Sequence, residues 1–201
     1  MAEDTLHPFV TRLPIGQRIP LPSEGIPGWE VFPFEGDIRV KVLEEPVLPE
    51  PPRDGEDGPE SCFGCQNPLH NAIWADEHWR VIHSGEPTGL PVMLLLCPLG
   101  HYDLTDLPPV RSAEFGPMLQ RVEKAIMGLG GIARVHVNKW GDGGAHLHMW
   151  LIARPAGMMQ LRGTCLPLWD DVLPKANEQE WRACLASVAA ALAAEGGTAY
   201  A

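Results

Sequence analysis

The pattern of hydrophobic and polar positions predicts four strands in the part of the chain that follows Cys62. Residues 79–83 predict a strand, and the apolar run 92–97, closed by Pro98, is typical of a buried strand. Two further strands are predicted at 133–137 and 147–153, joined by the glycine-rich turn 141–144. Short turns therefore connect most of the strands, which favours an antiparallel sheet meander.

Apolar residues at helical spacing predict one main helix between Pro108-Pro109 and the glycines at 130–131. Pro117 is expected in its first turn, where a missing N–H costs little. A C-terminal helix is predicted after Asn177, because Glu180 follows at capping-box spacing. The predicted fold class is α+β, with the sheet, the main helix and the C-terminal helix.

The N-terminal part of the chain has a different composition. Residues 1–60 are rich in proline and acidic residues, and 46–58 resemble a stiff linker. Within this arm, residues 37–43 alternate between polar and apolar and predict one edge strand. We therefore divide the chain into an N-terminal arm at 1–60, a globular domain at 61–176, and a C-terminal helix with a short tail at 177–201.

Charge and apolar content exclude several classes of function. The formal net charge of −11 over 201 residues argues against a general nucleic-acid binder, although backbone N–H groups can still hold a small phosphate ligand. No apolar run is long enough to cross a bilayer, and residues 1–30 do not resemble a signal peptide. We expect a cytoplasmic protein with no membrane partner.

The first candidate for chemistry is Cys62-Phe63-Gly64-Cys65. Two thiolates at this spacing provide half of a tetrahedral zinc site, and the eight histidines of the chain offer further ligands. A pair of reduced cysteines in a turn is the simplest alternative. A thioredoxin-type redox motif is disfavoured, because nothing after Cys65 resembles the helix that lowers a thiol pKa.

The second candidate is His146-Leu147-His148-Met149-Trp150. On a strand, the side chains of His146, His148 and Trp150 project from one face, next to the glycine turn and Asn138. One structural histidine beside an ordinary hairpin is the alternative interpretation. His83 either faces the same site or is a half-buried structural residue, and Trp169 is expected to pack on the sheet with the acids Asp170 and Asp171 outside.

Residues 62–155 resemble the histidine-triad superfamily, especially its zinc-containing branch and the related galactose-1-phosphate uridylyltransferases. The resemblance covers about half of the chain, and its motifs occur in the order of the family. They are Cys62-x-x-Cys65, Ala75-Asp76-Glu77, Cys97-Pro98-Leu99-Gly100-His101, Leu104-x-Asp106-Leu107, Asn138 and His146-x-His148.

The resemblance implies roles for individual residues. It implies a structural zinc ion bound by Cys62, Cys65, His101 and His146. His148 matches the nucleophile of the family, which attacks an α-phosphorus and forms a covalent nucleotidyl-histidine. A backbone carbonyl that accepts a hydrogen bond from Nδ1–H would leave Nε2 available.

Other positions match the substrate-binding residues. The Asn138 amide and the N–H groups of Gly143 and Gly144 would hold phosphate oxygens. Ser84 and Glu86 fall where members of the family bind the ribose, although the matching position, Gly85, lacks the expected carboxylate.

The sequence departs from the family pattern at two places near the chemistry. Trp150 stands where a third histidine or a glutamine is usual, and only its indole N–H could replace that donor. The loop 138–146 is shorter than in typical members. Loss of one oxyanion-type donor costs about 10²–10³ in rate, which predicts a slow enzyme.

The resemblance implies a nucleotide hydrolase or nucleotidyl transferase that acts on nucleoside phosphoramidates, dinucleoside polyphosphates or a nucleotide sugar. The alternative is a non-catalytic binding module for a nucleotide or phosphate metabolite on the same zinc-containing scaffold. A third possibility is a protein-interaction role for residues 1–58. The family also implies a possible homodimer, formed through the sheet edge and the helix.

Overall fold

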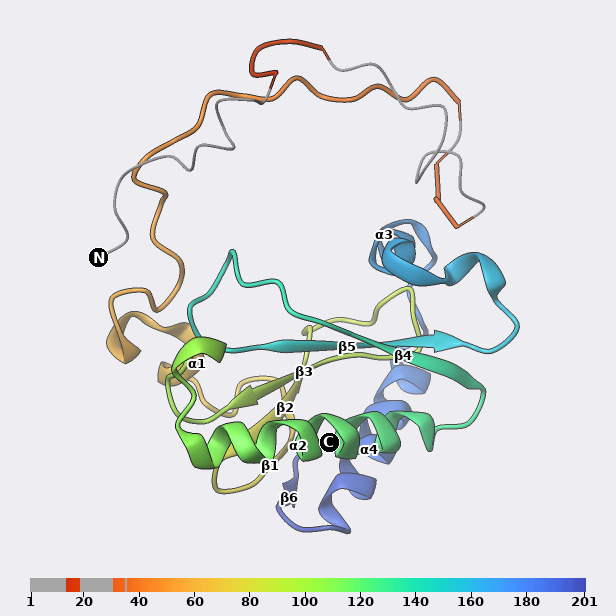
Figure 1. Ribbon diagram of the computed structural model, residues 1–201. Helices are drawn as coiled ribbons and strands as arrows, with labels where there is room; N and C mark the ends of the chain where they lie inside the picture. Colours follow the sequence, from red (N-terminus) through yellow and green to blue (C-terminus); the bar gives the residue numbers. More distant parts are fainter. Residues whose placement is uncertain (1–13, 19–30, 35) are drawn as a thin grey trace. The chain divides into compact units, whose positions relative to one another are not determined.

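The computed structural model describes residues 14–18, 31–34 and 36–201, and the chain divides into two units, Met1–Pro52 and Arg53–Ala201 (Figure 1). Residues 1–13, 19–30 and 35 of the predicted arm lie outside the described residues. The edge strand predicted at 37–43 is wrong. Residues 37–43 form no strand. They make isolated hydrogen bonds, such as that from the Gly16 N–H to the Leu43 carbonyl at 2.9 Å, and not the regular series of a strand pair.

The second unit begins at Arg53, earlier than the predicted boundary at residue 60. Residues 53–60 therefore belong to the globular unit and lead into helix α1, Phe63–Gln66. Four short 3-10 helices also occur in this unit, at Pro59–Ser61, Leu104–Asp106, Met159–Leu161 and Gly163–Cys165.

A six-stranded sheet forms the centre of this unit. Its strands are β1 Ala72–Ala75, β2 Trp79–His83, β3 Met93–Pro98, β4 Ile132–Asn138, β5 Met149–Pro155 and β6 Thr198–Ala199. The spatial order is β4-β5-β3-β2-β1-β6, and every neighbouring pair is antiparallel. Strands β1 to β3 follow one another as a meander, which confirms the predicted α+β class.

Two helices cover one face of the sheet (Figure 1). Helix α2, Pro109–Met127, packs against β4 and β5, and α4, Glu178–Ala193, packs against β1. Asn177 caps α4 as predicted, because its side chain accepts hydrogen bonds from the N–H groups of Gln179 and Glu180. Helix α2 already starts at Pro109, so Pro117 lies inside it and not in its first turn.

The pleat of the strands separates the core from an accessible face. On β3, Leu94 and Leu96 point into the core beneath the helices, whereas Leu95 and Cys97 line a cavity on the other face. Trp150 and Ile152 on β5 also lie on this second face, packed near helix α3, Leu166–Val172. Trp169 packs there as predicted, but Asp170 is buried rather than outside, at 8% exposed.

Strand β5 begins two residues later than predicted. His146, Leu147 and His148 precede it, because the Leu147 N–H donates to the Tyr102 carbonyl at 2.7 Å instead of joining the ladder. The two histidines are therefore held by a tight connection at the start of β5. No helix in the described part of the chain is both long and apolar enough to cross a bilayer.

Candidate metal centre and adjoining cavity

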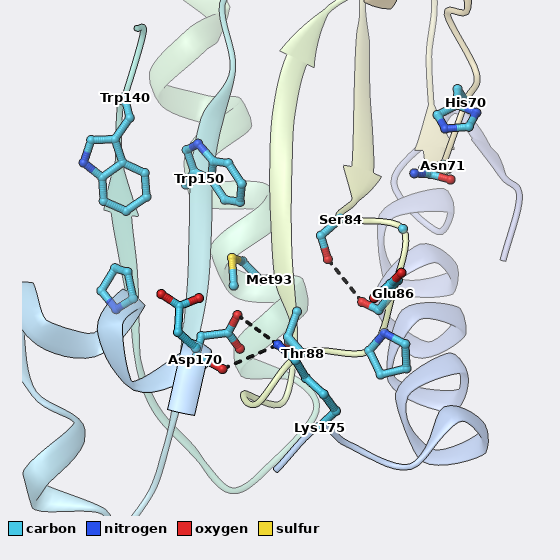
Figure 2. A pocket seen from close by; sticks show the side chains of 14 residues that line it. His70, Asn71, Ser84, Glu86, Thr88, Met93, Trp140, Trp150, Asp170 and Lys175 are labelled. Atoms are coloured by element: carbon cyan, nitrogen blue, oxygen red, sulfur yellow. Dashed lines mark hydrogen bonds and ion pairs between the residues drawn. The ribbon is translucent and has the colours of Figure 1, made fainter. Parts of the chain in front are cut away.

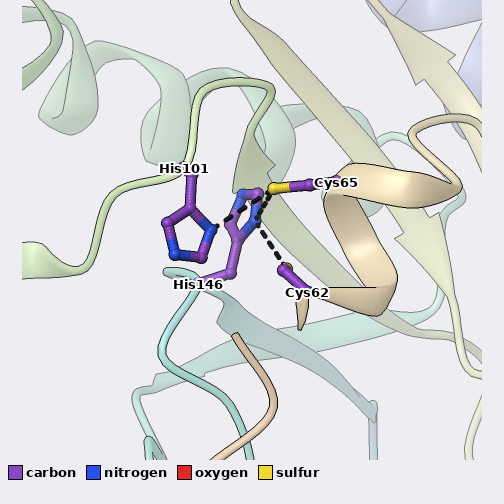
Figure 3. Close-up of side chains that lie close together, drawn as sticks. All are labelled: Cys62, Cys65, His101 and His146. Carbon is purple, nitrogen blue, oxygen red and sulfur yellow. Dashed lines mark hydrogen bonds between the residues drawn. The ribbon is translucent and has the colours of Figure 1, made fainter. Parts of the chain in front are cut away.

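Four predicted ligands meet beside helix α1. The ligand atoms of Cys62, Cys65, His101 and His146 all lie within 4.8 Å of one another (Figure 3). The Cys65 Sγ lies 3.3 Å from the His101 Nδ1 and 3.4 Å from the His146 Nδ1. Zinc–sulfur bonds of about 2.3 Å and zinc–nitrogen bonds of about 2.0 Å, in a tetrahedron, separate sulfur from nitrogen by roughly 3.5 Å. The four side chains therefore fit a closed Cys₂His₂ site.

Backbone carbonyls orient both histidines toward the cluster. The His146 Nε2 lies 2.8 Å from the Pro98 carbonyl oxygen, and the His101 Nε2 lies 3.1 Å from the Gly55 carbonyl oxygen. Because a carbonyl only accepts hydrogen bonds, each ring carries its proton on Nε2 and directs the Nδ1 lone pair at the cysteines. Outer-shell carbonyls of this kind are typical of metal-binding histidines.

Burial favours the uncharged forms of these groups when no cation is bound. It raises the pKa of the Cys65 thiol to about 11, and the neighbouring Cys62 adds to this effect. Burial also lowers the pKa of His146. A divalent cation would replace the thiol protons and bind the neutral imidazoles.

The segment before the cysteines is part of this centre, which the sequence did not indicate. Gly55 has a φ of +76°, and a Cβ at this position would lie 2.8 Å from the Cys62 Cβ and 2.9 Å from the His101 Cε1. Only glycine allows the backbone to approach so closely. The Asp54 carboxylate accepts a hydrogen bond from the Phe63 N–H at 3.1 Å and so caps the turn that carries both cysteines.

Arg80 was also missed, because an arginine on a short strand is expected to face solvent. It is only 3% exposed, and its Nη1 donates to the carbonyls of Gly64 at 2.7 Å and Pro68 at 2.6 Å. A Cβ on Gly64 would lie 2.7 Å from the Arg80 Nη2, so the glycine between the cysteines makes room for the guanidinium. Arg80 thereby fixes the cysteine turn to β2.

A cavity of about 280 Å³ opens beside the cluster and contains four of the other predicted site residues. His148, Gly143, Gly144 and Trp150 line it, above a floor that includes Ile82 and Leu95. The His148 Nδ1 lies 2.8 Å from the His146 carbonyl oxygen and donates to it. The Nε2 atom of His148 therefore carries the lone pair.

Asp54 also holds the glycine loop at the rim of this cavity. Its N–H donates to the Gly143 carbonyl at 3.1 Å, and its carbonyl accepts from the Ala145 N–H at 2.9 Å. At the start of the loop, the Arg53 Nη1 donates to the Gly141 carbonyl at 3.0 Å. The loop is thus fixed by the residues that precede the metal cluster.

The remaining predicted residues lie apart from this cavity. Asn138 pairs with Trp150 in register on β4 and β5 but lines neither this cavity nor the larger one beside it. Ser84 and Glu86 line the larger cavity (Figure 2), and the Ser84 hydroxyl donates to the Glu86 carbonyl. His83 packs against the Trp181 ring with the centroids 4.9 Å apart, which supports the structural interpretation of this residue.

Comparisons by sequence find no relative: no protein-family model and no curated protein matches the chain. Comparisons by structure do. A histidine triad protein from Bradyrhizobium japonicum is 18% identical, with 60% of this chain and 89% of that chain covered and a TM-score of 0.50. A zinc-bound histidine triad family protein from Mycobacterium smegmatis is 23% identical, with 69% and 99% covered and a TM-score of 0.49.

A hypothetical histidine triad nucleotide-binding protein from Sulfolobus tokodaii strain7 is 15% identical, with 64% of this chain and 89% of that chain covered and a TM-score of 0.47. At such identities a likeness concerns the fold and not the activity. The match to the Bradyrhizobium protein, with a TM-score of 0.50, shows a shared fold. This chain has the fold of the histidine triad proteins, in a divergent form.

Proposed function

We propose that the chain hydrolyses or transfers a nucleotidyl group at the α-phosphate, with His148 as the nucleophile. The observation that carries this proposal is the hydrogen bond from the His148 Nδ1 to the His146 carbonyl at 2.8 Å. It fixes the tautomer in which the Nε2 lone pair is available, next to the glycine loop that lines the same cavity.

The reaction has two in-line displacements. The Nε2 lone pair forms a bond to the α-phosphorus, and the bond from phosphorus to the leaving group breaks with its electron pair. The leaving group takes up a proton from the solvent. Water then attacks the phosphorus and loses a proton to the solvent, the bond from phosphorus to Nε2 breaks with its electron pair returning to Nε2, and neutral His148 and a nucleoside monophosphate are released. A transferase would use a second acceptor in place of water.

Polar groups around His148 would bind the phosphate. The N–H groups of Gly143 and Gly144 would hold its non-bridging oxygens, whereas the Asn138 amide, which lines neither cavity, is not given this role. Trp150 would replace the usual donor at its position, since its indole N–H has no hydrogen-bond partner among the described residues. Ser84 and Glu86 would contact the ribose from the edge of the neighbouring cavity.

The Cys₂His₂ cluster would hold a structural zinc ion. The neutral Nδ1 atoms and the two thiols suit zinc, and four protein ligands leave no position for a substrate water. The ion would therefore hold the site together without taking part in the reaction. The residues around His148 would do the chemistry.

A non-catalytic binding module is the second candidate, and Trp150 favours it. Its ring contacts Trp140 with the centroids 5.8 Å apart, so a pair of indoles occupies the place beside His148 where the family usually has a histidine or a glutamine. Such a cavity would keep nucleotide binding while the reaction is slowed or lost.

Turnover of a nucleotide panel separates the two candidates. We expect slow hydrolysis of at least one nucleoside phosphoramidate, dinucleoside polyphosphate or nucleotide sugar, abolished in His148→Ala. His78→Ala is the matched control, because this histidine is 39% exposed and lies outside both cavities. Binding by calorimetry without turnover would select the binding module, and equal rates for His148→Ala and wild type would refute the enzyme.

A further inference from the structure

The glycine loop beside His148 begins against two cationic side chains. The Arg53 Nη1 donates a hydrogen bond to the Gly141 carbonyl at 3.0 Å. A Cβ on Gly141 would lie 2.8 Å from the Lys139 Nζ, so this glycine leaves room for the ammonium group. The start of the loop is therefore packed against a guanidinium and an ammonium group.

Asp103 joins these two cations. Its Oδ2 accepts a hydrogen bond from the Arg53 Nη1 at 3.2 Å, and its Oδ1 lies 3.1 Å from the Lys139 Nζ. The same Nη1 thus bridges the Asp103 carboxylate and the Gly141 carbonyl. All three charged side chains are partly buried, with the Asp103 side chain 21% exposed, so salt screens these pairs less than pairs on the open surface.

The position of Asp103 is itself fixed. It caps the 3-10 helix Leu104–Asp106, because its Oδ1 accepts from the Leu104 N–H at 2.6 Å while the Asp106 carboxylate accepts from the Asp103 N–H at 2.7 Å. The two residues before it also hold the site: His101 belongs to the metal cluster, and the Tyr102 carbonyl holds the connection before β5. Three consecutive residues thus contact the metal cluster, the connection that carries both histidines and, through the two cations, the glycine loop.

Arg53 is committed to this network rather than free to bind a ligand. Its Nε and Nη2 donate to the Glu56 carboxylate, and its Nη1 donates both to Asp103 and to Gly141. A guanidinium has five N–H groups, so these bonds use most of them. The side chain therefore serves to hold the loop.

We propose that Asp103 is a positioning residue that holds the glycine loop in the shape that binds phosphate beside His148. Gly143 and Gly144 of this loop line the cavity of His148. Backbone hydrogen bonds of Asp54 hold the end of the loop, so the contacts of Asp103 act on its start. The placement of the loop is independent of the proposed function, whereas its effect on phosphate binding rests on it.

Hydrogen exchange on the full chain tests the placement of the loop without a ligand. The Ala145 N–H donates to the Asp54 carbonyl and the Asp54 N–H donates to the Gly143 carbonyl, so both amides exchange only when the loop moves away. In Asp103→Asn they should exchange about tenfold faster, while amides of α2 keep their wild-type rates.

Asp57→Asn is the matched control for this measurement, because Asp57 is exposed and lines neither cavity. Its amides should exchange as in wild type. Unchanged exchange of the Asp54 and Ala145 amides in Asp103→Asn would overturn the proposal. A loss of zinc and of thermal stability as large as in His101→Ala would show a general loss of structure and would also refute a local role.

Calorimetry with AMP and adenosine measures the effect on phosphate binding, because the two probes differ only in the phosphate. Asp103→Asn and Arg53→Met should each bind AMP about tenfold more weakly than wild type and adenosine equally well, since a binding group misplaced by about 1 Å costs up to about 10²-fold. Removal of a negative charge alone would strengthen the binding of an anion, so the direction of the change in Asp103→Asn separates positioning from charge.

A double-variant cycle assigns the effect to the contact with Gly141. Asp103→Asn/Arg53→Met should lose no more AMP affinity than the weaker of the two single variants, because both act through one contact. Additive losses, or an equal loss of adenosine affinity, would refute the assignment. Equal AMP affinity of Asp103→Asn and wild type would do so as well.

The two measurements distinguish a failure of this proposal from a failure of the proposed function. Faster exchange in Asp103→Asn, with no binding of AMP to wild type and no turnover, would uphold the placement of the loop and refute the proposed function. Turnover by wild type with an unchanged KM in Asp103→Asn would do the reverse. If both hold, KM should rise about tenfold with little change in kcat, because the loop would bind the phosphate in the ground state as in the transition state.

Discussion

His148 is oriented in the opposite sense to the two histidines of the metal cluster. His101 and His146 each bond a carbonyl through Nε2 and present Nδ1, whereas His148 bonds a carbonyl through Nδ1 and presents Nε2. The two roles proposed for the His-x-His pair thus follow from the carbonyl that each ring meets. The His-x-His spacing predicts that the two rings lie near each other, but it does not predict which nitrogen of each ring bonds a carbonyl.

Replacement of Arg80 should weaken the metal site without touching a ligand. Arg80→Met removes the donors to the Gly64 and Pro68 carbonyls, so the cysteine turn is no longer fixed to the sheet. Loss of such supporting contacts lowers metal affinity by about 10-fold or more. Competition with a chelating dye measures this, with Arg134→Met as an exposed control; equal zinc affinity in the two variants would contradict the role of Arg80.

His83 should make stability depend on pH. Burial, followed by the nearby Arg182, lowers its pKa below the usual value of 6.5. The unfolded chain therefore binds this proton more readily, so the stabilisation is present above about pH 6.5 and is lost as the pH falls through the folded pKa.

In His83→Gln, the free energy of unfolding should change less between about pH 7 and about pH 5 than in wild type. Denaturation curves at several pH values measure the difference. His78→Gln is the control, because it alters a partly exposed histidine outside the hydrophobic core, and it should keep the wild-type profile. An identical profile for His83→Gln and wild type would show that His83 titrates alike in both states.

The predictions for single residues agreed with the structure where the residue type has few possible roles. The four proposed zinc ligands meet as the family motif implied, because cysteine and histidine at those spacings serve few other purposes. The sequence did not indicate Gly55 and Arg80, because their roles depend on tertiary contacts: Gly55 lies against Cys62 and His101, and Arg80 lies against Gly64. A glycine at the end of a proline-rich stretch and an arginine on a strand are both commonplace in sequence.

Among the elements, regular hydrophobic patterns predicted structure well. The strand at 79–83 was predicted with the bounds that β2 has, and the cap at Asn177 was confirmed. The start of β5 was wrong because the Leu147 N–H bonds outside the ladder. The alternation at 37–43 forms no strand, since a pattern alone does not provide a neighbour to pair with.

Helix α4 offers a test at this scale. Asn177→Ala removes the acceptor for the N–H groups of Gln179 and Glu180 and should lower the free energy of unfolding by about 1 kcal/mol. Chemical denaturation measures it. Gln179→Ala, at the exposed neighbouring position, is the control and should be close to neutral; equal stabilities of the two variants would show that the cap contributes little.

At the scale of the whole globular unit, the metal cluster joins three distant parts of the chain. Its ligands come from the turn of α1, the segment after β3 and the connection before β5. The segment 53–55 adds contacts to the cysteine turn, His101 and the glycine loop. The order of the motifs predicted that the four ligands meet, but the contribution of residues 53–55 depends on tertiary contacts.

The homodimer stays a prediction.

Removal of the metal should therefore loosen the whole site. We expect about one zinc ion per chain by elemental analysis, lost in Cys62→Ser and in His101→Ala, with a lowered thermal midpoint in both. Cys184→Ser is the matched control, because Cys184 is half-buried beside the helical core, away from the cluster. A metal-free wild type of undiminished stability would refute the structural zinc.

The most direct test of the central claim is a search for the covalent intermediate on zinc-loaded protein. Nucleotide substrate is added, the reaction is stopped within a turnover, and peptides are mapped by mass spectrometry under conditions that preserve phosphorus–nitrogen bonds. The account predicts a nucleotidyl mass increment on the peptide that contains His148, absent from His148→Ala. Turnover with no increment on this peptide, or with the increment on another residue, would contradict it.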